Sequence, residues 1–79
     1  MSTNHLVKAD KELARARALM NEAIESLIEA ASIAANDDLI IEQQIDAVTQ
    51  HLSLAKRFLG FTRRNIEGQT GKPRASKEV

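Results

Sequence analysis

The chain has 79 residues, with 11 basic and 11 acidic side chains, so its formal net charge is zero. It contains no cysteine, which excludes a disulfide framework and cysteine-ligated zinc. A single core in so short a chain rarely supplies more than ~3–5 kcal/mol of stability, so we expect self-association to help. No apolar run approaches the roughly 18 residues of a membrane span, and we therefore expect no membrane partner and a cytoplasmic location.

The first predicted helix spans about residues 5–35, which contain neither proline nor glycine. Residues 1–4 are a short lead-in in which Thr3 or Asn4 can cap the helix. Apolar residues recur every seven positions, the first four of them large, and an alanine stands three residues after each of these four. These rows are Leu6, Leu13, Met20, Leu27 and Ala34, with Ala9, Ala16, Ala23 and Ala30. The spacing predicts a narrow seam that another helix can approach closely.

A turn at 36–37 separates this helix from a second one, predicted over about 38–66. Asn36 can end the first helix, and Asp37 is a good N-cap for the second. The predicted seam of the second helix alternates steps of four and three residues: Ile41, Ile45, Val48, Leu52, Ala55, Leu59, Thr62 and Ile66. Gly60 lies within this helix, and residues 67–79 lose the periodicity and are predicted to form a flexible tail.

Two helices of matched length joined by a tight turn predict an all-α fold, an antiparallel two-helix hairpin. Folding about the turn brings large seam residues to similar heights on both helices. The predicted core is Leu13, Met20, Leu27, Ile45, Leu52 and Leu59.

Each predicted helix carries more apolar surface than one neighbour can cover. The surplus residues are Ile40, Ala47, Leu54, Phe58 and Phe61 on the second helix, and Leu19, Ile24, Ile28, Ala31 and Ile33 on the first. Charge is also divided, because residues 21–55 carry seven acids and no lysine or arginine, whereas the remainder nets +7. We therefore expect a homodimer in which two hairpins pair head to tail as an antiparallel four-helix bundle. In architecture this resembles the up-down four-helix bundles built from paired hairpins.

The sequence offers no catalytic, cofactor-binding or metal-ligating constellation, so we predict that the protein is not an enzyme. His5 and His51 are far apart in a hairpin, and we interpret both as structural or surface residues. Glu22, Glu25 and Glu29 share a helix face without the Glu-x-x-His pattern of metal sites in bundles.

The remaining hypothesis is a small protein-interaction module, such as an inhibitor, adaptor or chaperone-like regulator. Its partner-binding residues would be Phe58, Phe61, Leu54 and Ile40. A basic patch of Lys56, Arg57, Arg63 and Arg64 offers two alternatives, a docking site for an acidic protein or for nucleic acid. The same four side chains can instead serve only to meet a helix dipole and the acidic end of a second subunit. A purely structural dimerisation element is a third reading.

Overall fold

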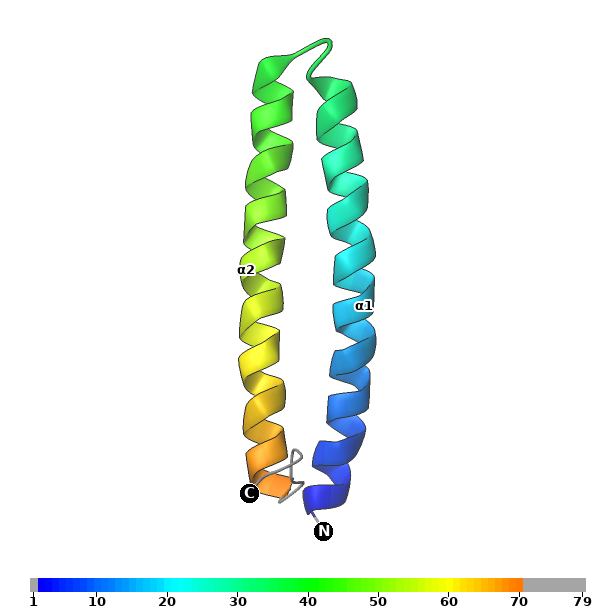
Figure 1. Cartoon of the computed structure of the whole chain (residues 1–79), viewed down its shortest axis with the longest axis vertical. Helices are drawn as coiled ribbons and strands as arrows, with labels where there is room; N and C mark the ends of the chain where they lie inside the picture. The colour runs from blue at the N-terminus through cyan, green and yellow to red at the C-terminus, as the bar shows by residue number, and fades with distance from the viewer. Residues whose placement is uncertain (1, 71–79) are drawn as a thin grey trace, which may run out of the picture.

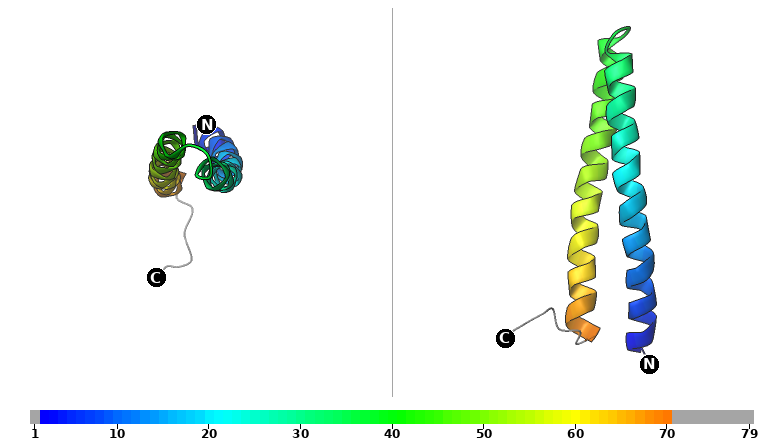
Figure 2. Two further views of the ribbon diagram at one scale, coloured as in Figure 1. Left: turned by 90° about the horizontal axis from the view of Figure 1, so that it is seen from above. Right: turned by 45° about the vertical axis from the view of Figure 1, so that its right-hand side comes forward.

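The computed structural model describes residues 2–70, which form two α-helices joined by a short turn. Helix α1 runs Ser2–Ala34 and helix α2 runs Leu39–Thr70. They lie antiparallel and side by side, with the turn at one end and the start of α1 and the end of α2 at the other (Figure 1). Seen from above, the hairpin is a single layer of two helices (Figure 2). The predicted all-α hairpin is confirmed.

Helix α1 begins before its predicted start and α2 runs past its predicted end, while at the turn both stop one residue short of their predicted bounds. Helix α1 begins at Ser2, so Thr3 and Asn4 lie inside it and do not precede it as caps. Helix α2 continues to Thr70, four residues past the predicted end. Ile66 and Thr70 line a small hollow together with Val7 of α1, so this last part of α2 still lies beside the first helix. The rest of the predicted tail, 71–79, lies outside the described residues.

The turn is held by backbone hydrogen bonds and one side-chain cap. The N–H groups of Asp37 and Asp38 both donate to the carbonyl oxygen of Ala34, at 2.9 and 2.8 Å. The carboxylate Oδ1 of Asp38 accepts hydrogen bonds from the N–H groups of Ile40 at 2.9 Å and Ile41 at 3.3 Å. Asp38, and not Asp37 as predicted, therefore caps α2, because its side chain satisfies amides that lack a helical partner.

One heptad row on each helix faces the other helix as expected, and we call these the leucine rows. They are Leu6, Leu13, Met20, Leu27 and Ala34 on α1, and Ile45, Leu52, Leu59 and Ile66 on α2. Leu59 is buried and the other members are half-buried, so all six predicted core residues lie on the inner side of the hairpin. Two hydrogen bonds between the helices, from Arg63 to Asp10 and from Lys56 to Asn21, agree with the expected antiparallel register of α1 and α2.

The second row of the seam differs from the prediction on both helices. Ala9, Ala23 and Ala30 are exposed and Ala16 is half-buried, while Ile41, Val48, Ala55 and Thr62 are exposed. The rows that pack inside instead are Asp10, Ile24 and Ala31 on α1, where Arg17 of the same row is exposed, and Glu42, Thr49, Lys56, Arg63 and Thr70 on α2. A leucine row combined with the residues three positions later alternates steps of three and four, and so does a leucine row combined with the residues four positions later. Both combinations therefore fit the spacing of a helix seam. The hairpin adopts the rows that carry the Arg63–Asp10 and Lys56–Asn21 contacts.

Candidate interaction surfaces

The choice of seam rows gives the hairpin two unlike faces. On a helix, a step of four residues turns about 40° forward and a step of three about 60° back, so the two rows flank a leucine row on opposite sides. An approximate two-fold axis relates antiparallel helices, which places corresponding rows of α1 and α2 on the same face. Asp10 and Arg63, each in the row four after a leucine, do meet on one face. The rows three after a leucine therefore form the opposite face.

We call this opposite side the apolar face. Its members are Ala9, Ala16, Ala23 and Ala30 with Leu19 and Ile33 on α1, and Ile41, Val48, Ala55 and Thr62 with Phe58 on α2. The row that holds Leu19 and Ile33 also carries His5, Glu12 and Ser26. Leu19 and Ile33 are 59% and 60% exposed, and Val48 is 53% exposed. Soluble monomers seldom expose contiguous apolar surface of this kind, so it is a candidate interaction surface.

The four predicted partner-binding residues form a strip along the outer edge of α2, beside the apolar face. Ile40, Leu54 and Phe61 recur at multiples of seven, and Phe58 stands four residues after Leu54. All four are exposed. The rings of Phe58 and Phe61 meet edge to face with centroids 5.9 Å apart, and the Arg64 guanidinium lies 5.7 Å from the Phe61 centroid. The strip thus ends in an ordered aromatic pair that a cation adjoins.

The predicted basic patch lies on the polar face, the side that carries the Asp10–Arg63 contact. It borders an open hollow of about 520 Å³, which we call the basic hollow. Its charged lining is Arg17, Lys56, Arg57, Arg63, Arg64 and Glu67. Arg17 comes from α1 and was not among the predicted residues. The antiparallel register of the two helices could have predicted that Arg17 joins the patch, because the register that sets Asp10 opposite Arg63 also sets Arg17 opposite Lys56.

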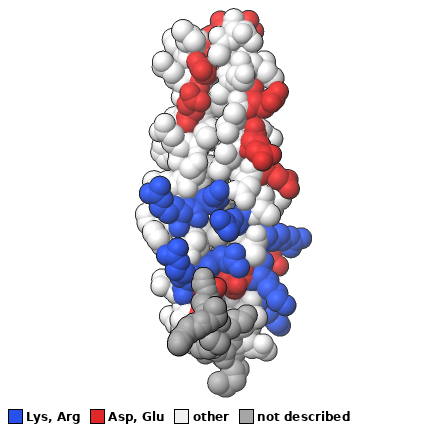
Figure 3. Space-filling model, in the orientation of Figure 1, with Lys and Arg blue, Asp and Glu red and all other residues white. Residues whose placement is uncertain are grey.

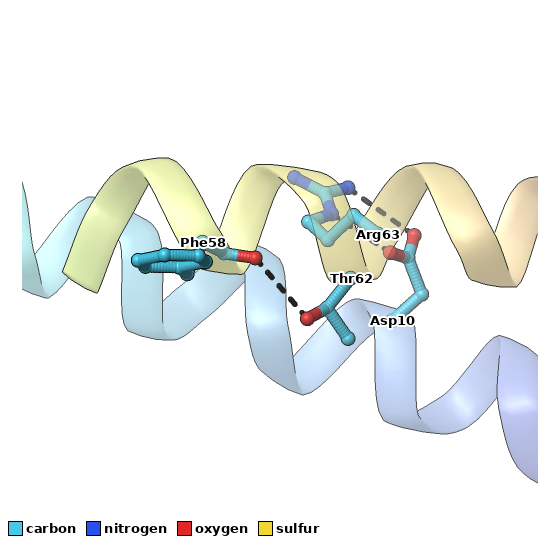
Figure 4. A network of polar contacts seen from close by, with 4 residues as sticks. All are labelled: Asp10, Phe58, Thr62 and Arg63. Atoms are coloured by element: carbon cyan, nitrogen blue, oxygen red, sulfur yellow. Dashed lines mark hydrogen bonds and ion pairs between the residues drawn. The ribbon is translucent and has the colours of Figure 1, made fainter. Parts of the chain in front are cut away.

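Two of the patch residues bridge the helices. Arg63 Nε donates to Asp10 Oδ1 at 2.7 Å and Nη2 to Asp10 Oδ2 at 3.2 Å, a bidentate ion pair between side chains that are 29% and 23% exposed (Figure 4). The hydrogen bonds that Arg63 donates to the Asp10 carboxylate raise the pKa of Arg63, so the guanidinium stays charged. Lys56 Nζ donates to Asn21 Oδ1 at 2.6 Å. Within residues 2–70, Arg17 and Arg57 form no ion pair.

Charge is divided along the length of the polar face. Lysine and arginine gather around the half that bears the chain ends, and aspartate and glutamate gather toward the turn (Figure 3). This matches the division in the sequence, where residues 21–55 carry only acidic charges. A long polyanion laid along the whole face would meet repulsion over the turn half, so the basic hollow suits a short anionic segment.

The side chains considered for chemistry are not brought together. His51 is exposed, and its Nδ1 donates to the carbonyl oxygen of Ala47 at 2.8 Å on its own helix. His5, Glu22, Glu25 and Glu29 are also exposed. Across residues 2–70 no group of three or more acidic or histidine side chains is arranged to hold a metal ion. Neither α1 nor α2, over the same range, is long and apolar enough to cross a membrane.

Comparison with known proteins adds no further guide to function. No protein-family model matches the chain, and neither the curated proteins nor the solved structures searched contain a match.

Proposed function

We propose that the protein is a non-enzymatic protein-interaction module that acts as a dimer of hairpins. One observation carries this proposal: burial is small and apolar exposure is large. Among the described hydrophobic residues only Ala31 and Leu59 are buried, whereas ten large ones are 43–66% exposed. A core so thin leaves little free energy to offset conformational entropy, and covering the apolar face would supply the difference.

A second copy of the chain is the proposed cover for the apolar face. Two-fold homodimers are the commonest soluble oligomers. The turn half is acidic and the other half basic, so two copies attract each other when they lie head to tail. Such a dimer is an antiparallel four-helix bundle.

The outer strip of Ile40, Leu54, Phe58 and Phe61 is the proposed site for a different protein. Ile40, Leu54 and Phe61 lie at the outer edge of the apolar face, so a dimer formed on that face leaves these three accessible. Phe58 directly precedes a leucine-row residue, as Leu19 does, and lies nearer the covered side. Exposed aromatic side chains are frequent anchors at protein interfaces. The cation beside Phe61 would favour a partner with acidic groups around an apolar centre.

Sedimentation equilibrium over a hundredfold concentration range tests the dimer. We expect a mass twice the 8.7 kDa of one chain at high concentration, and a thermal midpoint that falls on dilution. One chain mass throughout, with a constant midpoint, contradicts the proposal.

Capture from a lysate of the native host tests the partner site. Phe58→Ala combined with Phe61→Ala should abolish recovery of any specific partner while leaving helix content unchanged. Ile28→Ala, at an equally exposed residue outside the strip, is the control and should retain it. Equal recovery by both variants counts against the strip. A stable dimer that captures nothing supports the purely structural alternative.

Nucleic acid binding is a second candidate because Arg17 joins the predicted patch around one hollow. Guanidinium groups bind phosphates well, and this candidate predicts affinity that falls steeply with salt. A gel shift at low salt with short RNA and duplex DNA tests it. Loss of retardation in Arg17→Gln plus Arg57→Gln supports it, and no retardation at high protein concentration excludes it.

A further inference from the structure

A row of charged residues borders the apolar face on α1. Lys8, Arg15, Glu22 and Glu29 recur every seven residues, and each directly precedes one of the four alanines. All four are exposed. Arg15 pairs with Glu12 on its own helix at 3.3 Å, but both side chains are 72% exposed and free to rearrange. The row lies on the side of the alanines that points away from α2, so it would flank any helix seated on them.

The order of charge along this row is two basic residues followed by two acidic ones. Such a row matches a reversed copy of itself. If α1 meets the α1 of a second copy in antiparallel orientation, Lys8 faces the second copy's Glu29 and Arg15 faces the second copy's Glu22. The same reversal sets Ala9 against the second copy's Ala30 and Ala16 against the second copy's Ala23. One two-fold axis near Leu19 serves both sets.

The two ways of stacking hairpins face to face differ in which helices meet. A two-fold axis across the hairpin reverses its long direction, which places α1 on α1 and the acidic turn beside the basic end. An axis along the hairpin keeps the direction, places α1 on α2 and sets like-charged ends together. The division of charge therefore favours the first arrangement, and it is the arrangement in which the flanking row is complementary.

We propose that the occupant of the apolar face is a second copy whose α1 packs antiparallel on α1, centred on Leu19. Salt bridges from Lys8 to the second copy's Glu29 and from Arg15 to the second copy's Glu22 then flank the contact. The alanines let the two helix backbones approach closely, and Leu19 meets the second copy's Leu19 in the central layer. In the outer layers Ile33 lies opposite the second copy's His5, and Glu12 lies opposite the second copy's Ser26. This assignment rests on the proposed dimer and adds its helices, its register and its axis.

Single-cysteine variants test the axis, because the natural chain has no cysteine. A residue at a two-fold axis meets its own copy, so Leu19→Cys should form a disulfide-linked dimer under mild oxidation. Ala18→Cys is the control, since residue 18 is exposed at the same height but lies toward the polar face. We expect Leu19→Cys to cross-link at least tenfold faster than Ala18→Cys at equal concentration.

Charge variants test the register. Lys8→Glu plus Arg15→Glu makes the flanking row entirely acidic, and Glu22→Lys plus Glu29→Lys makes it entirely basic. Each variant alone should self-associate at least tenfold more weakly than the natural chain, and an equimolar mixture should form a heterodimer. Glu25→Lys plus Asp46→Lys changes the net charge equally on the polar side and should weaken association less than the row variants do.

The outcomes separate this inference from the proposed dimer. A natural chain that sediments as a dimer, with Leu19→Cys cross-linking no faster than Ala18→Cys, overturns the α1–α1 contact and leaves the dimer standing. Equal weakening by the row variants and their control overturns the register. A natural chain that is monomeric throughout overturns both, and leaves the apolar face to a different protein.

Discussion

The two faces of the hairpin repeat every seven residues, yet they differ in how their side chains are satisfied. On the polar face, Asp10 and Arg63 reach each other, and Lys56 reaches Asn21. On the apolar face, Leu19, Ile33 and Val48 are more than half exposed. Polar side chains at a seam complete their hydrogen bonds within the hairpin, whereas apolar side chains gain only by removing surface from water. The face that needs a further partner is therefore the apolar one.

Removing a side chain from between the helices should have the largest effect. Leu59→Ala is expected to lower the free energy of unfolding by about 2–3 kcal/mol, because Leu59 is 9% exposed and its loss leaves a cavity. Urea unfolding followed by circular dichroism measures this. Ile28→Ala, at a residue 58% exposed, should cost less than half as much. Equal losses at both positions would mean that the leucine rows do not form the core.

The next largest effect should come from enlarging an alanine on the apolar face. Ala23→Gln is expected to weaken self-association at least tenfold, about 1.4 kcal/mol, because the longer side chain holds a packed helix away. Ala18→Gln introduces the same side chain at an exposed alanine toward the polar face and should leave association unchanged. Sedimentation equilibrium measures the association of both variants. Equal weakening would show that the apolar face is not the one through which the chain self-associates.

The ion pair across the polar face should contribute about 1 kcal/mol, as expected for a partly exposed, bidentate pair. A double-mutant cycle with Asp10→Asn and Arg63→Gln measures the coupling in urea unfolding. The raised pKa of Arg63 means that its contribution is present at all pH values below the ordinary arginine pKa and is lost only above it. Raising the pH from neutral to mildly alkaline should therefore leave the coupling energy unchanged. A coupling energy near zero would show that the ion pair does not stabilise the hairpin.

The smallest effect should be a gain. A methyl group added at Gly60 meets no atom within 4 Å, so Gly60→Ala should stabilise the hairpin by about 0.5–1 kcal/mol through helix propensity. Gly60 borders the basic hollow on the polar face. If a second copy covered that face instead of the apolar one, the added methyl group would disturb it and dimerisation would weaken. Thermal unfolding of this variant measures the gain in stability, and its sedimentation distinguishes a dimer formed on the apolar face from one formed on the polar face.

The sequence predicted the two helices, the turn and which residues of α1 lie level with which residues of α2, because the pattern behind each of these predictions allows one interpretation. Residues 5–35 contain no helix breaker, and the leucine rows fix which heights meet. The rows beside them were predicted on the wrong side, because Ala9 and Asp10 both continue a three-and-four spacing from Leu6 and Leu13. Only the paired helices show that Asp10 has Arg63 opposite it. Arg17 was missed for the same reason, since its place beside the basic hollow depends on α2.

The Asp10–Arg63 pair also bears on how the hairpin avoids misalignment. Leucine rows that repeat every seven residues would fit almost as well if one helix slid by a whole heptad along the other. Such a slide would part the half-buried Arg63 guanidinium from the Asp10 carboxylate, and unpaired charge is costly away from bulk water. A slide one way would set Arg63 opposite Arg17, and a slide the other way would leave Asp10 to Lys56 and Arg63 without a carboxylate. One polar contact near the open end thus selects a single alignment from a set that the apolar residues alone would leave nearly equal in energy.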